Sequence, residues 1–312
     1  MPGGLVALFD DVAVIARAAA ASVDDVGVAA SRAGSKAAGV VIDDAAVTPS
    51  YVTGLTPDRE LPLIWRITLG SFKNKLIFLL PGALLLSEFL PWLIIPILML
   101  GGAYLSYEGA EKVLEKLGAE KHGKTLEDPI EDMEKFEKER TAGAIRTDLI
   151  LSAEIMAITL AQVAEETLIT RGIVLAIVGI GVTVVVYGAV AIIVKMDDIG
   201  LHLAQKPSEF AQRFGTGLVN FMPTLLKALS FIGTIAMLWV GGGIIIHGTE
   251  ELGFHPLAEF THGIEHAVEL ATGAMGGILG WASYATLSAV VGLILGGILV
   301  FVLHKVFKIG AH

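Results

Sequence analysis

Residues 172–194 read GIVLAIVGIGVTVVVYGAVAIIV, 23 consecutive residues without a charged side chain. As an α-helix this stretch is roughly 34 Å long, which is enough to cross the hydrocarbon core of a bilayer. The composition of the whole chain agrees with this interpretation. Of its 312 residues, 54% are hydrophobic and only 17% are charged, against roughly 25% charged in an average soluble domain. We therefore predict an all-α, polytopic membrane protein, with the lipid bilayer as its first partner.

The composition also excludes several other classes of protein. Cysteine is absent, so the chain is no disulfide-linked secreted scaffold and has no thiol chemistry. The net charge of −10 would repel a phosphate backbone, so we expect no nucleic-acid partner. A mean hydropathy of +0.71 is incompatible with a disordered chain or a soluble coiled coil.

Other apolar stretches flank the first one, and several contain Pro or a charged residue. Counting them, we expect six to eight membrane helices, some broken or re-entrant. The candidate segments are Leu76–Leu90, Pro91–Glu108, Thr147–Ala164, Leu218–Ile246 and Ala271–Leu303, the last read as two short helices or as one span with a re-entrant piece.

The polar stretches divide the chain into three parts. Residues 1–60 are predicted to form amphipathic N-terminal helices at the cytoplasmic face or the membrane interface. Residues 61–195 form a first membrane half with a charged loop at 109–146. Residues 196–312 form a second membrane half with a loop rich in His and Glu at 247–269.

A short pattern recurs in the two halves. Gly, six residues, Gly, one residue and Glu occur at residues 102–111 and again at residues 241–250. The segment after the first copy, 109–146, has eight Lys and Arg, whereas residues 248–267 have none. The positive-inside rule then places the two loops on opposite faces of the membrane. This arrangement predicts inverted-topology repeats, which are typical of transporters. A parallel duplication or a chance pattern of glycines is the alternative.

Ionisable residues inside apolar segments are candidate ion-binding groups. Glu154 lies within the apolar stretch that begins at Thr147, where an unpaired carboxylate costs on the order of 3 kcal/mol or more. Asp148 lies near the start of the same stretch, Glu108 lies in the first copy of the repeat, and Lys227 is the base within Leu218–Ile246. A Glu154–Lys227 pair would neutralise both charges, either as a structural ion pair or as a proton relay.

A second group of candidates follows the second copy of the repeat. On a helix, His255, Glu259, His262 and His266 share one face, and such side chains can converge on a zinc-like divalent metal. Residues 262–266 also spell His-x-x-Glu-His, in which Glu265 would be the base of a metallohydrolase. A hydrated helix whose His and Glu side chains face water, or a pH sensor, are the alternatives.

Several motifs resemble the YedI-like family of bacterial inner-membrane proteins. They extend over nearly the whole chain in order: Arg59-Glu-Leu-Pro62, Gly70-Ser71 with Asn74-Lys75, Gly143-Ala-Ile-Arg-Thr-Asp148, Ile150-Leu-Ser-Ala-Glu154-Ile, Lys195-Met-Asp-Asp198, Lys227-Ala-Leu-Ser230 and Gly241-Gly-Gly243. The resemblance implies a multi-pass protein of the bacterial inner membrane without an assigned activity. In the histidine-rich stretch His247, His262, Glu265 and His266 match, whereas His255 and Glu259 fit less well.

Three functions remain open at this point. The leading hypothesis is a secondary transporter or channel-like permease for a small solute or ion, with Glu154 binding a proton or cation. The second is a membrane-embedded metal-dependent hydrolase that uses His262, Glu265 and His266. The third is a non-catalytic scaffold whose N-terminal helices bind a partner. The glycine-rich helix faces are also compatible with a homo-oligomer.

Overall fold

The computed structural model describes residues 25–35, 47–48, 57–118 and 133–306, and every regular element there is helical. This confirms the predicted all-α class. A short helix covers residues 25–35. The longer elements are α3 (Pro57–Lys73), the π-helix η1 (Asn74–Leu79), α4 (Leu80–Phe89), the 3-10 turn η2 (Pro91–Leu93), α5 (Ile94–Lys116), α6 (Met133–Gln162), α7 (Leu168–Ala204), α8 (Glu209–Glu251), α9 (Pro256–Thr272), the 3-10 turn η3 (Gly273–Met275), α10 (Gly276–Phe301) and the π-helix η4 (Val302–Val306).

Within the described residues, five helical stretches are long and apolar enough to cross a membrane. They are Arg59–Phe89, Pro91–Lys116, Leu168–Ala204, Glu209–Glu251 and Gly276–His304. The protein is therefore a multi-span membrane protein.

The sequence led us to expect six to eight membrane helices, and the difference has two sources. The stretch read as two pieces near the C-terminus contains one long helix, α10. The apolar end of α6 is shorter than a full span and carries Asp148 and Glu154.

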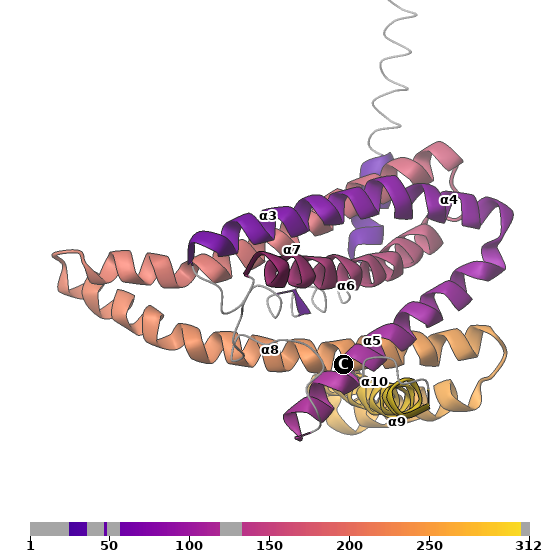
Figure 1. Cartoon of the computed structure of the whole chain (residues 1–312). Coiled ribbons are helices and arrows are strands. Elements are labelled where there is room, and N and C mark those ends of the chain that lie inside the picture. The colour runs from indigo at the N-terminus through magenta and orange to yellow at the C-terminus, as the bar shows by residue number, and fades with distance from the viewer. Residues whose placement is uncertain (1–24, 36–46, 49–56, 119–132, 307–312) are drawn as a thin grey trace, which may run out of the picture.

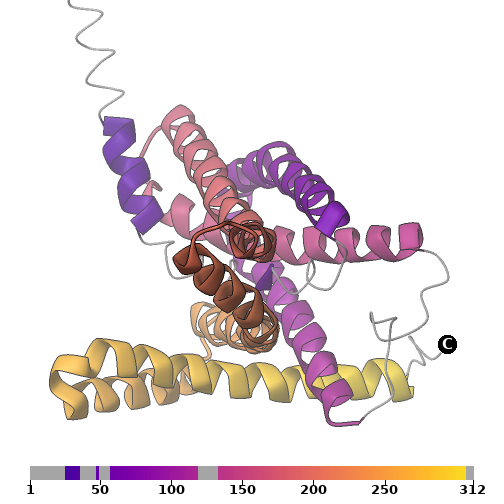
Figure 2. The same cartoon turned by 90° about the vertical axis from the view of Figure 1, so that its left-hand side faces the viewer.

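The helices form two groups in space (Figure 1). In the first group α3, α6 and α7 contact one another, and α4 extends α3 beyond the π-helix. In the second group α8, α9 and α10 lie together. Helix α5 leaves the tip of α4 and packs on α8 and α10, as Figure 2 shows from the side. The contact between α7 and α8 joins the two groups. Although α5 belongs to the first half of the sequence, it packs mainly with the second half.

Two irregularities of the first membrane segment, a π-helical turn and the end of α4, lie next to prolines. Pro81 has no N–H, and its ring would clash with the carbonyl of Ile77 in a regular α-helix. The wider π-helical turn over Asn74–Leu79, directly before it, accommodates this residue. Leu90 precedes Pro91 and adopts φ −143° and ψ 54°, which ends α4. The chain therefore turns there and enters α5.

The two segments of the predicted repeat pack directly against each other. A Cβ added to Gly102 of α5 would lie 2.9 Å from the carbonyl oxygen of Gly241 in α8. At Gly241 an added Cβ would lie 2.7 Å from the carbonyl oxygen of Gly102. Only glycine at both positions lets the two backbones approach this closely. Each copy of the repeat thus contributes its first glycine to one shared contact.

The contacts on either side of this glycine pair are related by symmetry. Gly109 of α5 packs against Leu238 of α8, and Gly248 of α8 packs against Met99 of α5. Leu238 precedes the first glycine of its copy by three residues, as Met99 does in its own copy. The two helices therefore cross antiparallel about a local pseudo-two-fold axis perpendicular to them. The C-terminal ends of α5 and α8 lie at opposite ends of this crossing.

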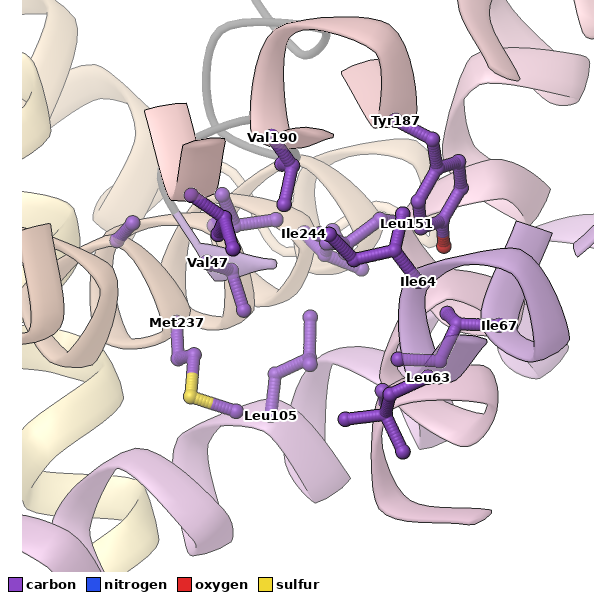
Figure 3. Close-up of a cluster of buried hydrophobic side chains, with 14 of the residues drawn as sticks. Val47, Leu63, Ile64, Ile67, Leu105, Leu151, Tyr187, Val190, Met237 and Ile244 are labelled. Atoms are coloured by element: carbon purple, nitrogen blue, oxygen red, sulfur yellow. The ribbon is translucent and has the colours of Figure 1, made fainter. Parts of the chain in front are cut away.

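The apolar core joins both groups of helices. Figure 3 shows side chains from α3, α5, α6 and α8 converging between the layers, among them Leu63, Leu105, Leu151 and Ile244. A second cluster joins Ala30 and Ala33 of the short helix 25–35 to α6 and α7. Most of the rest of the predicted N-terminal part, residues 1–24, 36–46 and 49–56, lies outside the described residues.

Candidate functional site

An ion pair lies buried inside the first group of helices. The Lys75 Nζ of η1 donates to Asp148 Oδ1 of α6 over 2.9 Å, and the exposed fractions of the two side chains are 1% and 2%. Lys75 belongs to the candidate span Arg59–Phe89. Charges at this depth in a membrane protein are expensive unless they are paired, and they usually mark a route for ions or protons.

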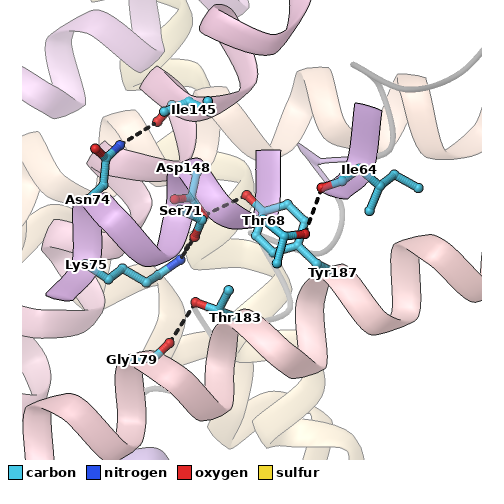
Figure 4. Close-up of polar contacts among 10 residues, drawn as sticks. All are labelled: Ile64, Thr68, Ser71, Asn74, Lys75, Ile145, Asp148, Gly179, Thr183 and Tyr187. Carbon is cyan, nitrogen blue, oxygen red and sulfur yellow. Dashed lines mark hydrogen bonds and ion pairs between the residues drawn. The ribbon is translucent and has the colours of Figure 1, made fainter. Parts of the chain in front are cut away.

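Two further side chains complete this polar cluster (Figure 4). Lys75 Nζ donates a second hydrogen bond to Ser71 Oγ of α3 at 2.6 Å. The Tyr187 hydroxyl of α7 donates to Asp148 Oδ1 at 2.9 Å. The Tyr187 ring also lies 6.0 Å from Lys75 Nζ, at the edge of the range for a cation–π contact. Side chains of three helices, η1, α6 and α7, therefore meet at one buried carboxylate oxygen.

The second carboxylate oxygen is buried but has no hydrogen-bond partner. Asp148 Oδ2 is inaccessible to solvent and receives no hydrogen bond from the described residues. One turn later on α6, Ser152 Oγ is in the same state, and Ser152 is 0% exposed. Most buried polar groups in proteins are satisfied, so such atoms indicate a bound water, an ion or a functional state.

The local packing explains how α7 comes this close. Gly179 of α7 lies over Met156 of α6, and an added Cβ would meet the Met156 Cε at 2.7 Å. The same Cβ would lie 3.9 Å from the Cβ of Lys75. One turn along α7, Thr183 donates to the Gly179 carbonyl at 2.7 Å, so its hydroxyl is satisfied within its own helix. A small residue at position 179 thus lets the π-helix, α6 and α7 enclose the ion pair.

The predicted Glu154–Lys227 pair does not form among the described residues. Glu154 is half-buried on α6, two turns beyond Asp148, and Lys227 is exposed on α8. The base that meets Asp148 of α6 is Lys75, which our sequence interpretation did not select. Its signal in the sequence was a single Lys directly before the apolar stretch Leu76–Leu90. Lys75 and Asp148 are far apart in the chain, so their contact could not be predicted from spacing.

Glu108 lies in a second polar layer next to this site. Thr147 of α6 donates to Glu108 Oε2 of α5 at 3.4 Å. Lys112, one turn later on α5, donates to Glu108 Oε1 at 3.0 Å. Thr147 and Asp148 are adjacent on α6, so one turn of this helix connects the buried ion pair to the polar residues of α5.

The histidine and glutamate residues of α9 do not gather around a common point. His262 Nδ1 lies 3.0 Å from Glu265 Oε2, and His266 pairs with Glu269 at 3.8 Å along the same helix. His255 and Glu259 are exposed at the start of α9. Among the described residues no three His, Asp or Glu side chains are placed to hold a metal ion. The zinc-like site, and the hydrolase built on it, stay predictions.

The His262 ring has a different partner. It stacks on Tyr284 of α10, with the ring centroids 5.2 Å apart and an angle of 12° between the planes. This contact joins α9 to α10 and gives His262 a packing role between the two helices. Gly276 and Gly280 of α10 also pack against α9.

The Lys75 ammonium and the Asp148 carboxylate together carry no net charge, and this balance lets the pair stay buried.

Comparison with known proteins gives one match. The model of a family described as "Protein of unknown function (DUF808)" matches residues 3–302. No curated protein and no solved structure matches the chain significantly.

Proposed function

The chain belongs to this family of unknown function, and we propose that it is a secondary transporter for a small ion. In this proposal Asp148 and Lys75 form the binding and coupling site. Asp148 was one of the candidate residues from the sequence, and its partner is Lys75. The sequence interpretation had instead paired Lys227 with Glu154. The half-buried Glu154 becomes a neighbour of the site, not its centre.

The buried ion pair is the observation that carries the proposal. Replacing a buried ion pair by apolar side chains of similar volume is often neutral or stabilising. Stability alone therefore does not explain why a Lys and an Asp are placed at 1% and 2% exposure inside a membrane bundle. A function that needs a charge to be bound and released there does explain it.

The antiparallel crossing of α5 and α8 supports a transporter. Inverted-topology repeats are related by an axis in the membrane plane, and their movement about a central site gives alternating access. The local pseudo-two-fold axis at Gly102 and Gly241 would have this direction if α5 and α8 both cross the membrane. Beyond the crossing the two copies differ, since α10 packs on α5 and α8 whereas α6 packs on α3 and α7.

We further propose the bacterial inner membrane as the location. The resemblance to YedI-like proteins supports this, and the charged segment 109–146, with its eight Lys and Arg, would face the cytoplasm. A small solute or ion as the transported species, and assembly as a homo-oligomer, are also part of this proposal.

Flux measurements on protein reconstituted in liposomes test the proposed function. With a pH-sensitive dye inside the vesicles, we expect proton movement driven by a sodium or potassium gradient. Asp148→Asn removes the carboxylate and should lower this flux at least tenfold. Glu88→Gln, which removes an exposed carboxylate of α4 that pairs with Arg171 at 3.6 Å, should leave it unchanged.

Glu154→Gln tests the role of Glu154 separately from that of Asp148. Loss of flux in Asp148→Asn with retention in Glu154→Gln supports the site described above. The opposite result would return the coupling role to Glu154, as the sequence first indicated. Equal flux in the wild type and Asp148→Asn, for protons, sodium and potassium alike, would refute the proposal.

A further inference from the structure

We infer that a cavity between α4, α5 and α6 is a binding site for one acyl chain of a membrane phospholipid. The cavity has a volume of about 120 Å³ and lies where the membrane stretches Arg59–Phe89 and Pro91–Lys116 diverge from their common turn (Figure 1). This inference goes beyond the proposed transport function and does not depend on it.

The described residues that line the cavity are one glycine and apolar side chains. Phe78 and Leu86 belong to the first stretch, Ile97 belongs to α5, and Met156 and Leu160 belong to α6. None of these lining residues has a hydroxyl, an amide or a charged group in its side chain, so a water molecule would find few hydrogen-bond partners there. Apolar cavities of roughly 150 Å³ stay dry in proteins and bind hydrocarbons such as benzene. A hydrocarbon segment is therefore the ligand that suits this cavity.

The cavity is continuous with the surface of the protein that faces lipid. Phe78 and Ile97 line it and are themselves 57% and 43% exposed. Both residues belong to candidate membrane spans, so the medium around them is the hydrocarbon of the bilayer. The acyl chain of a neighbouring lipid reaches the cavity directly from this side.

The cavity also has the depth of one leaflet of the bilayer. Its two long walls belong to different spans, so the turn at residues 90–93 lies at one membrane surface, where the exposed Trp92 is a typical interface residue. Phe78 precedes Leu90 by twelve residues, which is roughly 18 Å along a helix. The hydrocarbon core is about 30 Å thick, so the cavity extends from near this surface to about the bilayer centre.

The bound chain belongs to a phospholipid and not to a free fatty acid. Enclosing a fatty acid here would bury its carboxylate, for which the described lining residues offer no side-chain hydrogen-bond donor. Phospholipids form the bilayer into which the cavity opens, and their headgroup stays in water while one tail enters from the side. We therefore expect the cavity to select the tail and to be indifferent to the headgroup.

A bound chain would support the two elements that enclose the buried ion pair. Phe78 and Leu79 belong to the π-helix that carries Lys75, and Met156 both lines the cavity and packs on Gly179. An empty cavity leaves these side chains without dispersion contacts on one side, and a chain that enters restores them. Binding should therefore stabilise the whole protein.

Gly82→Leu tests the site, because the new side chain would fill the cavity. Gly82 lines the cavity, and a Cβ added to it would meet no neighbouring atom within 4 Å, so the variant should fold. Gly188→Leu is the matched control. Gly188 is exposed on α7, and a Cβ added there also meets nothing within 4 Å.

Native mass spectrometry counts the lipids that stay bound to the full-length protein in detergent after dioleoyl phosphatidylglycerol is added. We expect one strongly retained phospholipid on the wild type and on Gly188→Leu, and several-fold lower retention on Gly82→Leu. Dioleoyl phosphatidylethanolamine should be retained equally well, and oleic acid less well. Equal retention by the two glycine variants, preferred retention of oleic acid, or a dimer that Gly82→Leu abolishes would each overturn the inference.

Photocrosslinking locates the bound chain. A phosphatidylglycerol with a diazirine in the middle of one acyl chain should label peptides that contain residues 78–98 and 153–160. Gly82→Leu should lower this labelling several-fold and leave the labelling of α10 unchanged. Labelling spread evenly over all spans of the wild type would contradict a defined site.

Thermal unfolding in detergent gives a readout that counts no lipid. Phosphatidylglycerol should raise the melting temperature of the wild type and of Gly188→Leu. Gly82→Leu fills the void with its own side chain, so it should raise the melting temperature without lipid and lose the response to lipid. A Gly82→Leu variant that keeps the full response would show that the stabilising lipid binds elsewhere.

Discussion

Lys75 and Asp148 illustrate how a buried pair depends on both of its members. Removing one member of a buried ion pair leaves an uncompensated charge and typically costs about 3–5 kcal/mol. We therefore expect Lys75→Met and Asp148→Leu each to lower the free energy of unfolding by that amount. Both side chains are almost fully buried, so solvent screens this effect little. The double variant replaces the pair by apolar side chains and should recover most of the loss.

Denaturant titration in mixed micelles, followed by tryptophan fluorescence, measures these differences. Tyr187→Phe is a milder variant, because it removes one hydrogen bond to the carboxylate and should cost about 1–2 kcal/mol. A double variant in which the losses in free energy of unfolding of the two single variants simply add would be the opposite result. It would show that Lys75 and Asp148 do not stabilise each other, contrary to what their contact indicates.

At the residue scale the sequence predicted one member of the site. Asp148 was a candidate because it lies at the start of an apolar stretch, where a buried carboxylate is costly unless it is paired or functional. Lys75 was not, because a Lys at the edge of an apolar segment usually reaches the membrane surface. The π-helical turn and the packing of Gly179 turn it inward, and both depend on tertiary contacts that no short window of sequence contains.

At the scale of the elements, the adjacent residues Gly242 and Gly243 of α8 differ in how closely a neighbouring helix packs on them. A Cβ on Gly242 would overlap the carbonyl oxygen of Ser288 in α10, whereas a Cβ on Gly243 would meet nothing nearer than 3.9 Å. We expect Gly242→Ala to destabilise the α8–α10 contact by about 1–3 kcal/mol, since overpacking forces backbone shifts. Gly243→Ala should stabilise the helix by about 0.5–1 kcal/mol, because alanine is the better helix former.

Thermal unfolding in detergent compares the two variants directly. Similar melting temperatures for Gly242→Ala and Gly243→Ala would show that α8 and α10 do not touch at this point. The sequence predicted close helix packing at the glycine run 241–243, but not which glycine faces which helix, because three helices share these faces.

The long apolar stretches were predicted well as helices and less well as separate spans. Helix α8 continues through Pro223 as one element of 43 residues, although the sequence suggested that a stretch with this proline is broken. A proline removes one hydrogen bond but does not end a helix when the neighbouring contacts hold both sides. Helix breaks in such bundles are therefore decided by packing as much as by the residue itself.

At the scale of the whole molecule, the antiparallel crossing places the ends of α5 and α8 apart. Their C-terminal ends lead into the loops 109–146 and 247–269, for which the basic and non-basic compositions predicted opposite faces of the membrane. The antiparallel crossing of α5 and α8 is compatible with this prediction, because two antiparallel helices that both cross the membrane end on opposite sides. The assignment of which side is cytoplasmic still rests on the charge rule alone.

Cysteine labelling tests this topology, and the natural absence of cysteine makes the background clean. Leu117 is 78% exposed just after α5, and Leu252 is 59% exposed just after α8. A membrane-impermeant maleimide should label Leu252→Cys in intact cells, whereas Leu117→Cys should react only in inverted vesicles or after permeabilisation. Labelling of both positions from the same side would show that the two helices do not cross the membrane in opposite directions. The pseudo-two-fold axis would then not lie in the membrane plane, and the repeat would not support alternating access.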